Sequence, residues 1–466
     1  MSRRRSPGLQ IFLLACTIAL PALLVSAILF REALAIPILD DYHAVLDFAV
    51  NFSQLHSVHG QLGYVVAAQH NEYKLIFEHA VMATQLILLR HISISFLVAL
   101  GNLMLLPIFY VCWKNYFAEE ADFITRLELF LPISWMLFQL SYAETLDWSM
   151  GSLQNMAVVA FALLSIHFLT RPGIAAFFLA WIFGALACAS SANGFLLAPA
   201  GLLLLVQEQI GNQKAFAAAS AERQIAKRAW VAKIAAWTLV FLLMLTAYLY
   251  RYSFPPPVRH VGLLRKALFF FSFDGGAVEN MHGFPVPHLA IFVGIAIALI
   301  FAAAIRTRYR LANPFAFYAS VWIFLSAMLV SSVRVAMGLQ QSLSGRYKIY
   351  CDLLLIFCYA YLAQRIRASG LSRTRRQAIY FAATSCIILF SLASDAVGYK
   401  LLAKRRQRVL DGVAQYLANP AANTPMINPN EDLTPEMKRD QQDARMQLNR
   451  AIQAGVYTLP KDSTQK

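Results

Sequence analysis

Two adjacent carboxylates, Asp40 and Asp41, stand a short way after the first apolar run of the chain. Adjacent carboxylates suit general-base catalysis, because partial desolvation and mutual repulsion raise the pKa of one of them toward the operating pH. The same pair also fits an interfacial cap followed by solvated loop charges. Their spacing does not distinguish the two residues, so either Asp40 or Asp41 is a candidate base.

Further polar and aromatic side chains gather in residues 70–74 and 142–151. The candidate substrate-binding residues in these two segments are His70, Glu72, Glu144, Asp147 and Trp148. An indole ring beside carboxylates is suited to line a polar cavity that binds sugar by stacking and hydrogen bonding. Trp and Tyr are also enriched at membrane interfaces, so an ordinary interfacial belt is the alternative.

Two cations flank a tyrosine where a late apolar run begins, in the order Arg346, Tyr347, Lys348. Such a group would bind an anionic phosphate by charge-assisted hydrogen bonds, and an arginine can donate hydrogen bonds to two phosphate oxygens at once. These three residues are therefore a candidate phosphate site. Snorkelling of the two cations to lipid headgroups explains the same pattern.

Metal and nucleotide motifs are weak or missing in the sequence. Asp274, Glu279 and His282 share one polar segment, but their spacing matches no strong metal motif and fits a solvated loop. All six cysteines lie within or beside apolar runs, which argues against disulfides and against a cysteine metal site. No phosphate-binding loop or dinucleotide fingerprint occurs. We expect no nucleotide cofactor, and a divalent metal stays open.

The composition identifies the environment that must position these groups. Of the 466 residues, 59% are hydrophobic and 14% are charged, whereas soluble domains have roughly 45–50% and 25%. The apolar residues form separate runs, and only helices satisfy their own backbone groups in hydrocarbon, so the fold class is all-α and membrane-embedded. The net charge is +15, and the basic residues behind it fall between these runs. Basic residues in such positions orient a membrane protein, so the charge does not indicate nucleic-acid binding.

Eleven apolar runs predict about eleven transmembrane helices. They cover residues 9–30, 92–113, 127–142, 156–170, 174–189, 194–207, 232–250, 287–304, 315–333, 348–364 and 377–395. The first run is too long for a cleaved signal peptide, so we expect a retained helix. Most Lys and Arg residues fall on one side, which places the N-terminus in the cytoplasm and the C-terminus outside. Residues 75–90 make a run of only sixteen residues with Glu78 and His79 inside it, and we expect them to form an interfacial helix.

The predicted spans divide the chain into a membrane domain and a tail. Residues 1–395 form the predicted transmembrane catalytic domain, with a first outer loop at 31–91 and a second at 251–286. Residues 396–466 form a small outer C-terminal segment with helical patches, interrupted by Asn-Pro and Thr-Pro steps.

Five short motifs together resemble a known family. They are ILDDYH at 38–43, HNEYK at 70–74, YAETLDW at 142–148, SSANGFLLAPAG at 190–201 and GRY at 345–347. In this combination the chain resembles the GT-C superfamily of membrane glycosyltransferases, and within it the bacterial members that use polyprenyl-phosphate sugars. The short tail departs from larger members, which carry a sizeable outer domain, so the acceptor site stays undefined.

The resemblance implies a function in the cell (inner) membrane. A sugar would move from a polyprenyl-phosphate donor to a glycan, lipid or protein acceptor on the outer face. In such enzymes a carboxylate of the first outer loop acts as the base, which carries over to Asp41 or Asp40. Arg346, with Lys348 nearby, would stabilise the leaving phosphate.

Two other interpretations compete with glycosyl transfer. A transporter or flippase of a lipid-linked sugar would also need polar groups outside the membrane, although transporters usually place ionisable groups at its centre and show repeated halves. No such repeat occurs in this sequence. A non-catalytic scaffold would leave the clustered carboxylates unexplained.

Overall fold

The computed structural model describes residues 7–215, 220–254, 261–281, 287–421 and 435–460. Throughout these residues the regular structure is helical and no strand occurs, which confirms the all-α prediction. Nine helices of this part are long and apolar enough to cross a bilayer. Their bounds are Pro7–Glu32 (α1), Ile94–Asn115 (α5 and α6), Phe123–Leu146 (α7 to α8), Ser149–Leu169 (α9), Lys227–Leu249 (within α12, Ser220–Leu249), Pro287–Arg306 (α14), Pro314–Met337 (α16 and a following turn), Gly345–Arg367 (α17) and Arg373–Ala418 (α18).

Three other helices bear on the predicted span count. The predicted runs at 174–189 and 194–207 correspond to α10 (Ile174–Ser190) and α11 (Leu197–Ala215), which are joined by a short 3-10 helix at Ala192–Leu196 and both pack against α12. Helix α4 (Ile76–Leu89) has 14 residues and is about 21 Å long at 1.5 Å per residue. Because hydrocarbon is about 30 Å thick, α4 is too short to cross it. The count of eleven stays a prediction.

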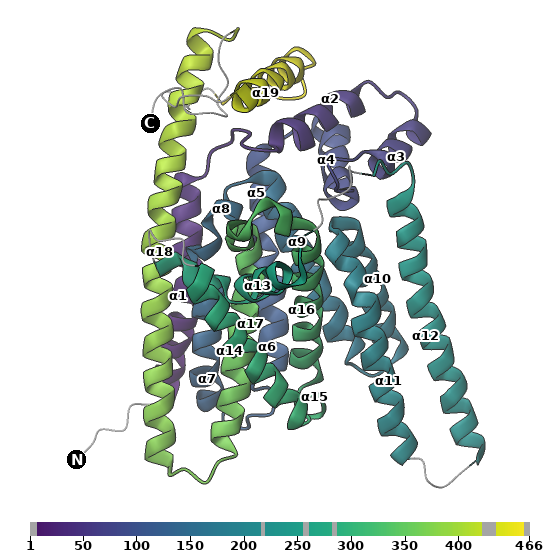
Figure 1. The fold of residues 1–466 in the computed structure, drawn as a ribbon, viewed down its shortest axis with the longest axis vertical. Helices are drawn as coiled ribbons and strands as arrows, with labels where there is room; N and C mark the ends of the chain where they lie inside the picture. The colour runs from purple at the N-terminus through teal and green to yellow at the C-terminus, as the bar shows by residue number, and fades with distance from the viewer. Residues whose placement is uncertain (1–6, 216–219, 255–260, 282–286, 422–434, 461–466) are drawn as a thin grey trace.

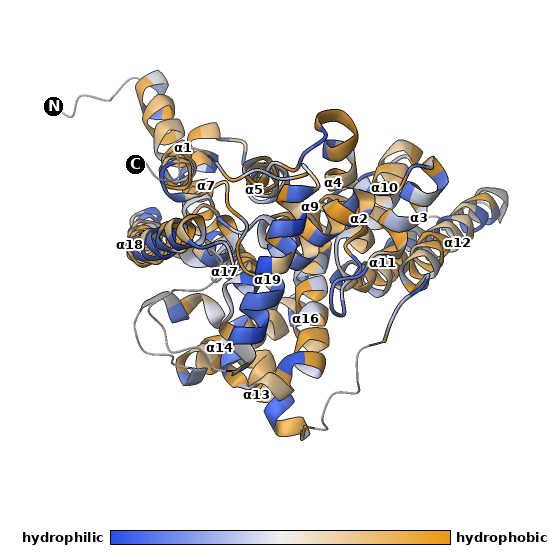
Figure 2. Cartoon of the chain, turned by 90° about the horizontal axis from the view of Figure 1, so that it is seen from above, coloured by the Kyte–Doolittle hydropathy of each residue, from blue (hydrophilic) through white to orange (hydrophobic). Residues whose placement is uncertain are grey.

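The bundle has two distinct ends, which we call upper and lower as in Figure 1. Helix α1 begins at the lower end, where α17 also leads into α18. The upper end contains α2 (Phe48–Ser53), α3 (Val58–Ala67), α4 and α19 (Pro435–Gln453). From above, α19 is largely hydrophilic, whereas the bundle helices are mostly hydrophobic (Figure 2). The first predicted outer loop and the tail therefore lie together at one end.

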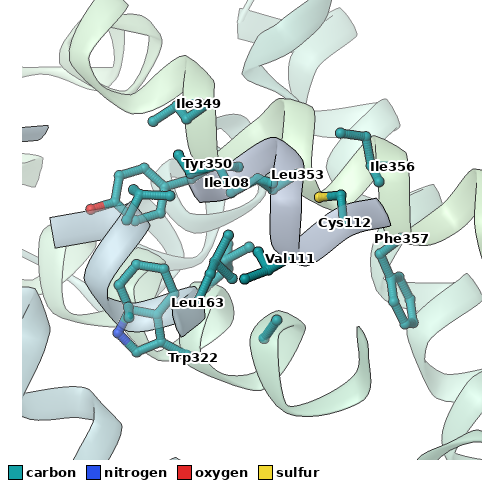
Figure 3. Close-up of a cluster of buried hydrophobic side chains, with 14 of the residues drawn as sticks. Ile108, Val111, Cys112, Leu163, Trp322, Ile349, Tyr350, Leu353, Ile356 and Phe357 are labelled. Atoms are coloured by element: carbon teal, nitrogen blue, oxygen red, sulfur yellow. The ribbon is translucent and has the colours of Figure 1, made fainter. Parts of the chain in front are cut away.

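Large apolar side chains occupy both the interior and the outer faces of the bundle. Figure 3 shows part of the interior, where Val111 of α6, Leu163 of α9, Trp322 of α16 and Leu353 of α17 pack together. On the outside, α1, α12 and α14 expose many apolar residues, among them Phe12, Leu23, Leu242, Leu243, Phe292 and Leu299. Extensive apolar surface of this kind suits contact with lipid.

Residues 261–281, within the second predicted outer loop, are packed into the bundle. Helix α13 (Leu263–Asp274) lies against α14 along two glycines. A Cβ on Gly275 would collide with the carbonyl oxygen of Ala290, and one on Gly294 would collide with that of Phe271. Glycine is required at both positions because the two backbones touch. His282 of the same predicted loop lies outside the described residues.

The described part of the tail forms a second apolar core with the first loop. Helix α18 has 46 residues, about 69 Å at 1.5 Å per residue, so it continues across residue 395 and beyond the thickness of a bilayer. Its upper part contributes Val413, and α19 contributes Leu448, to a cluster that includes Tyr42 and Leu46. The Tyr457 hydroxyl donates to the carbonyl of Ala35. The tail thus holds the segment that contains Asp40 and Asp41.

Truncation of Leu448 tests this second core. Leu448 is fully buried, so we expect Leu448→Ala to lower the free energy of unfolding by about 2–5 kcal/mol. Met446 on the same helix is 50% exposed, and Met446→Ala should change stability by less than about 0.5 kcal/mol. Thermal unfolding of purified protein in detergent measures both. Equal shifts in the two variants would contradict the packing of α19 on the first loop.

Candidate functional site

Asp41 is a buried carboxylate that joins the first loop to α9. Its Oδ1 accepts hydrogen bonds from Ser149 Oγ at 2.6 Å and from Met150 N at 2.9 Å. Its Oδ2 accepts one from Ile38 N at 3.1 Å. Ser149 and Met150 form the first turn of α9, whose backbone N–H groups lack partners within the helix. Asp41 thus caps α9 from a distant part of the chain.

Asp40, the preceding residue, is accessible. Its side chain is 44% exposed, and its Oδ2 lies 3.8 Å from His70 Nε2. That separation is too long for a hydrogen bond but close enough for an ion pair when His70 is protonated. The interaction with His70 is the largest influence and lowers the pKa of Asp40, and the charges of Arg346 and His43 lower it further. Asp40 is therefore ionised and open to solvent.

The two carboxylates differ in what they can do. Burial raises the pKa of Asp41 to about 6, and the negative charge of Asp40 is only a minor cause. A raised pKa within the pair was expected, but it belongs to the residue whose two oxygens are already hydrogen-bonded. A base must reach the proton that it accepts. Asp40 meets this requirement, whereas Asp41 positions the segment that carries it.

Arginines from two helices lie near Asp40. Arg346, in the first turn of α17, donates from Nε to Ser344 Oγ at 3.2 Å. Its guanidinium carbon is 5.9 Å from the ring centre of Trp148 and 5.9 Å from that of Tyr347. Arg334 ends α16. The charges of Asp40 and Arg346 act on both Arg334 and Tyr73, so these side chains form one group at the upper end.

The segment of residues 70–74 joins this group through two side chains. Glu72 forms an ion pair with Arg334, and the Arg334 guanidinium also donates to the Tyr73 hydroxyl. His70 lies within ion-pair distance of Asp40. The rings of His70 and His43 are stacked, with their centres 6.5 Å apart. Arg334 was not among the predicted site residues. Its position at the end of an apolar run, like that of Arg346 at the start of one, was the available signal.

Three more of the predicted site residues have structural partners. Lys348 is buried and pairs with Glu279 at 2.5 Å. Asp147 pairs with Arg405 of α18 at 2.5 Å, and burial raises its pKa to about 6. Glu144 Oε2 accepts from Gly345 N at 3.0 Å. These contacts tie residues 144–147 to α17 and α18.

The structure also bears on ligand binding at Trp148 and on metal binding by His, Cys, Asp and Glu side chains. Trp148 is buried, and within the described part of the chain its Nε1 has no hydrogen-bond partner. A buried indole N–H usually has a partner, so this donor is free for a polar ligand atom or a water molecule. Among the described residues, no group of three or more His, Cys, Asp or Glu side chains is placed to hold a metal ion.

Removal of the Asp41 carboxylate tests its positioning role. Asp41→Ala leaves the donors of Ser149, Met150 and Ile38 without their acceptor, so we expect unfolding to become easier by about 2–4 kcal/mol. The matched control is Asp47→Ala in the same segment. Asp47 pairs with Arg450 at 3.1 Å, and both side chains are about a third exposed, so its loss should cost less than about 1 kcal/mol. Thermal unfolding that shows no larger shift for Asp41→Ala would refute the role.

No family model matches the sequence, and no curated protein matches it either.

Proposed function

We propose that this chain is a GT-C-type membrane glycosyltransferase. It moves a sugar from a polyprenyl-phosphate donor to an acceptor on the outer face of the cell membrane. The accessible Asp40, whose pKa the charge of Arg346 helps to lower, carries this proposal, because the two side chains supply a base and a phosphate-binding cation. The proposal includes eleven spans, with α10 and α11 completing the nine apolar helices, and a cytoplasmic N-terminus.

The distribution of basic residues supports this orientation. Helix ends and connections at the lower end contain Lys114, Arg171, Arg306, Arg308, Arg310, Arg365, Arg367, Arg373, Arg375 and Arg376. Cytoplasmic loops of membrane proteins carry such an excess. The lower end is then cytoplasmic, and the group around Asp40 faces the outside.

In the proposed reaction Asp40 accepts the proton of the acceptor hydroxyl. The hydroxyl oxygen attacks the anomeric carbon and forms the new glycosidic bond, while the bond from that carbon to the phosphate oxygen breaks. The electron pair leaves with the polyprenyl phosphate, which gains negative charge. Positioned cations at the site where charge develops lower the barrier.

Arg346 is the cation best placed for the phosphate. It has no carboxylate partner among the described residues, whereas Arg334 is already paired with Glu72. Lys348 is engaged by Glu279. We therefore assign phosphate binding to Arg346, with Tyr347 beside it and Arg334 as a second positive charge.

Transport of a lipid-linked sugar is the second candidate. The specific observation in its favour is that acidic side chains are buried within the bundle. Asp274 of α13 is fully buried, and neither of its oxygens has a partner in the described residues. Asp352 of α17 is fully buried and accepts from Ser141 Oγ at 2.8 Å. Buried ionisable groups of this kind mark proton and ion pathways in transporters.

Replacement of Asp40 tests the proposed base. Asp40→Asn keeps the shape of the side chain but cannot accept the proton, so we expect sugar transfer to slow by about 10²- to 10⁴-fold. The measurement is transfer of radiolabelled sugar from a polyprenyl-phosphate hexose to an envelope-glycan extract by purified protein.

The matched control is Asp47→Asn, which removes a negative charge from the same segment outside the Asp40 group and should retain activity. Full activity of Asp40→Asn would refute the assignment of Asp40 as the general base. Movement of the donor across a bilayer without any sugar transfer would refute the glycosyltransferase proposal and support transport of a lipid-linked sugar.

The pH dependence distinguishes Asp40 from Asp41. Because the pKa of Asp40 is below its usual value, this carboxylate stays ionised throughout the range from about pH 5 to 7. Asp41 becomes protonated as the pH falls through about 6. We expect kcat/KM to show no acid limb near pH 6 that depends on Asp41. A limb with an apparent pKa of about 6, together with a loss of activity of about 10²- to 10⁴-fold in Asp41→Asn, would make Asp41 the base.

A further inference from the structure

A cavity with a volume of about 590 Å³ opens at the lower end of the bundle. It lies between α1, α7 (Phe123–Leu137), α17 and α18, where their spans begin or end. Its wall includes three arginines, Arg367, Arg373 and Arg376, and several apolar side chains. The connection from α1 to α2, which contains Asp40, is at the opposite end, so the cavity is a separate feature of the molecule (Figure 1).

Two of the three arginine charges in this cavity are not neutralised. Arg367 forms an ion pair with Glu120. Arg376 donates a hydrogen bond to the backbone carbonyl of Arg367 at 3.2 Å, and this contact leaves its charge uncompensated. Within the part of the chain that the structure describes, neither Arg373 nor Arg376 has a carboxylate in ion-pair range.

The second acidic residue of the wall does not cancel these charges. Glu128 accepts a hydrogen bond from Gln10 Nε2 at 3.3 Å, which directs it toward α1. The cavity therefore presents two guanidinium groups from the first turns of α18 to any ligand that enters. Each guanidinium group can donate two parallel hydrogen bonds to two oxygens of one phosphate.

Apolar side chains form the remainder of the wall. Leu14 of α1, Leu131 of α7 and Phe381 of α18 line the cavity, and Phe381 is 75% exposed. A free anion would gain nothing from these side chains, and a neutral lipid would leave the arginines unpaired. An amphipathic anion satisfies both parts of the wall.

We propose that this cavity binds the phosphate headgroup of an anionic phospholipid from the leaflet at the lower end. Arg373 and Arg376 hold the phosphate, and an acyl chain lies along Leu14, Leu131 and Phe381. Basic pockets between helices at a membrane surface bind headgroups in this manner. The lipid bridges α1, α7 and the α17–α18 hairpin, and it does so whether or not the upper end transfers sugar.

Native mass spectrometry of the purified full chain tests this site. The protein is delipidated in detergent and titrated with phosphatidylglycerol or with phosphatidylcholine. We expect the wild type to bind phosphatidylglycerol in preference. Arg373→Gln with Arg376→Gln should weaken that binding about 30-fold, since each basic side chain near an anionic headgroup contributes a factor of about five. Arg373→Gln alone should weaken it about fivefold.

The matched control removes two charges from the same end outside the cavity. Arg228 of α12 and Arg306 of α14 are exposed, and Arg228→Gln with Arg306→Gln should bind phosphatidylglycerol as the wild type does. Equal loss in the control pair, unchanged binding in the cavity pair, or equal affinity for phosphatidylcholine would each overturn the proposal. Displacement of the lipid by millimolar inorganic phosphate would also overturn it, since the site would then recognise phosphate alone.

Discussion

The capping of α9 by Asp41 is the interaction on which the arrangement of the upper end depends. One carboxylate satisfies two donors in the first turn of a transmembrane helix and one in the loop that precedes it. This contact gives the loop that carries Asp40 a polar attachment to α9. Burial of the carboxylate raises its pKa, and the hydrogen bonds offset part of that penalty. The accessible neighbour, Asp40, is placed by this contact.

Several further ion pairs fasten the same end of the molecule. Asp147 joins α18 through Arg405, and Lys348 of α17 joins Glu279. Loss of Arg405 would leave the buried Asp147 unpaired, and loss of Glu279 would leave the buried Lys348 unpaired, which is strongly destabilising. The tail adds apolar packing through α19. Two ion pairs thus hold residues of the upper end to α17 and α18. The apolar cluster formed with α19 holds the first loop.

Hydropathy predicted the helical membrane fold and the short helix at residues 76–89, because the length and composition of apolar runs report directly on the bilayer. The sequence also placed Asp40 and Asp41 in one segment. It did not distinguish them, because the partners of Asp41, Ser149 and Met150, lie more than a hundred residues away. The pairing of Lys348 with Glu279 is a long-range contact of the same kind. Charge spacing along the chain carries no information on such contacts.

We propose that the upper end cleaves a sugar from its lipid phosphate. The most direct measurement is phosphorus NMR of polyprenyl-phosphate hexose in proteoliposomes that contain the wild-type protein and an envelope-glycan extract. We expect the phosphodiester signal of the donor to decline and a phosphomonoester signal to appear, because the bond between the anomeric carbon and the phosphate oxygen breaks. A donor that stays a phosphodiester while it moves to the opposite leaflet would contradict the claim.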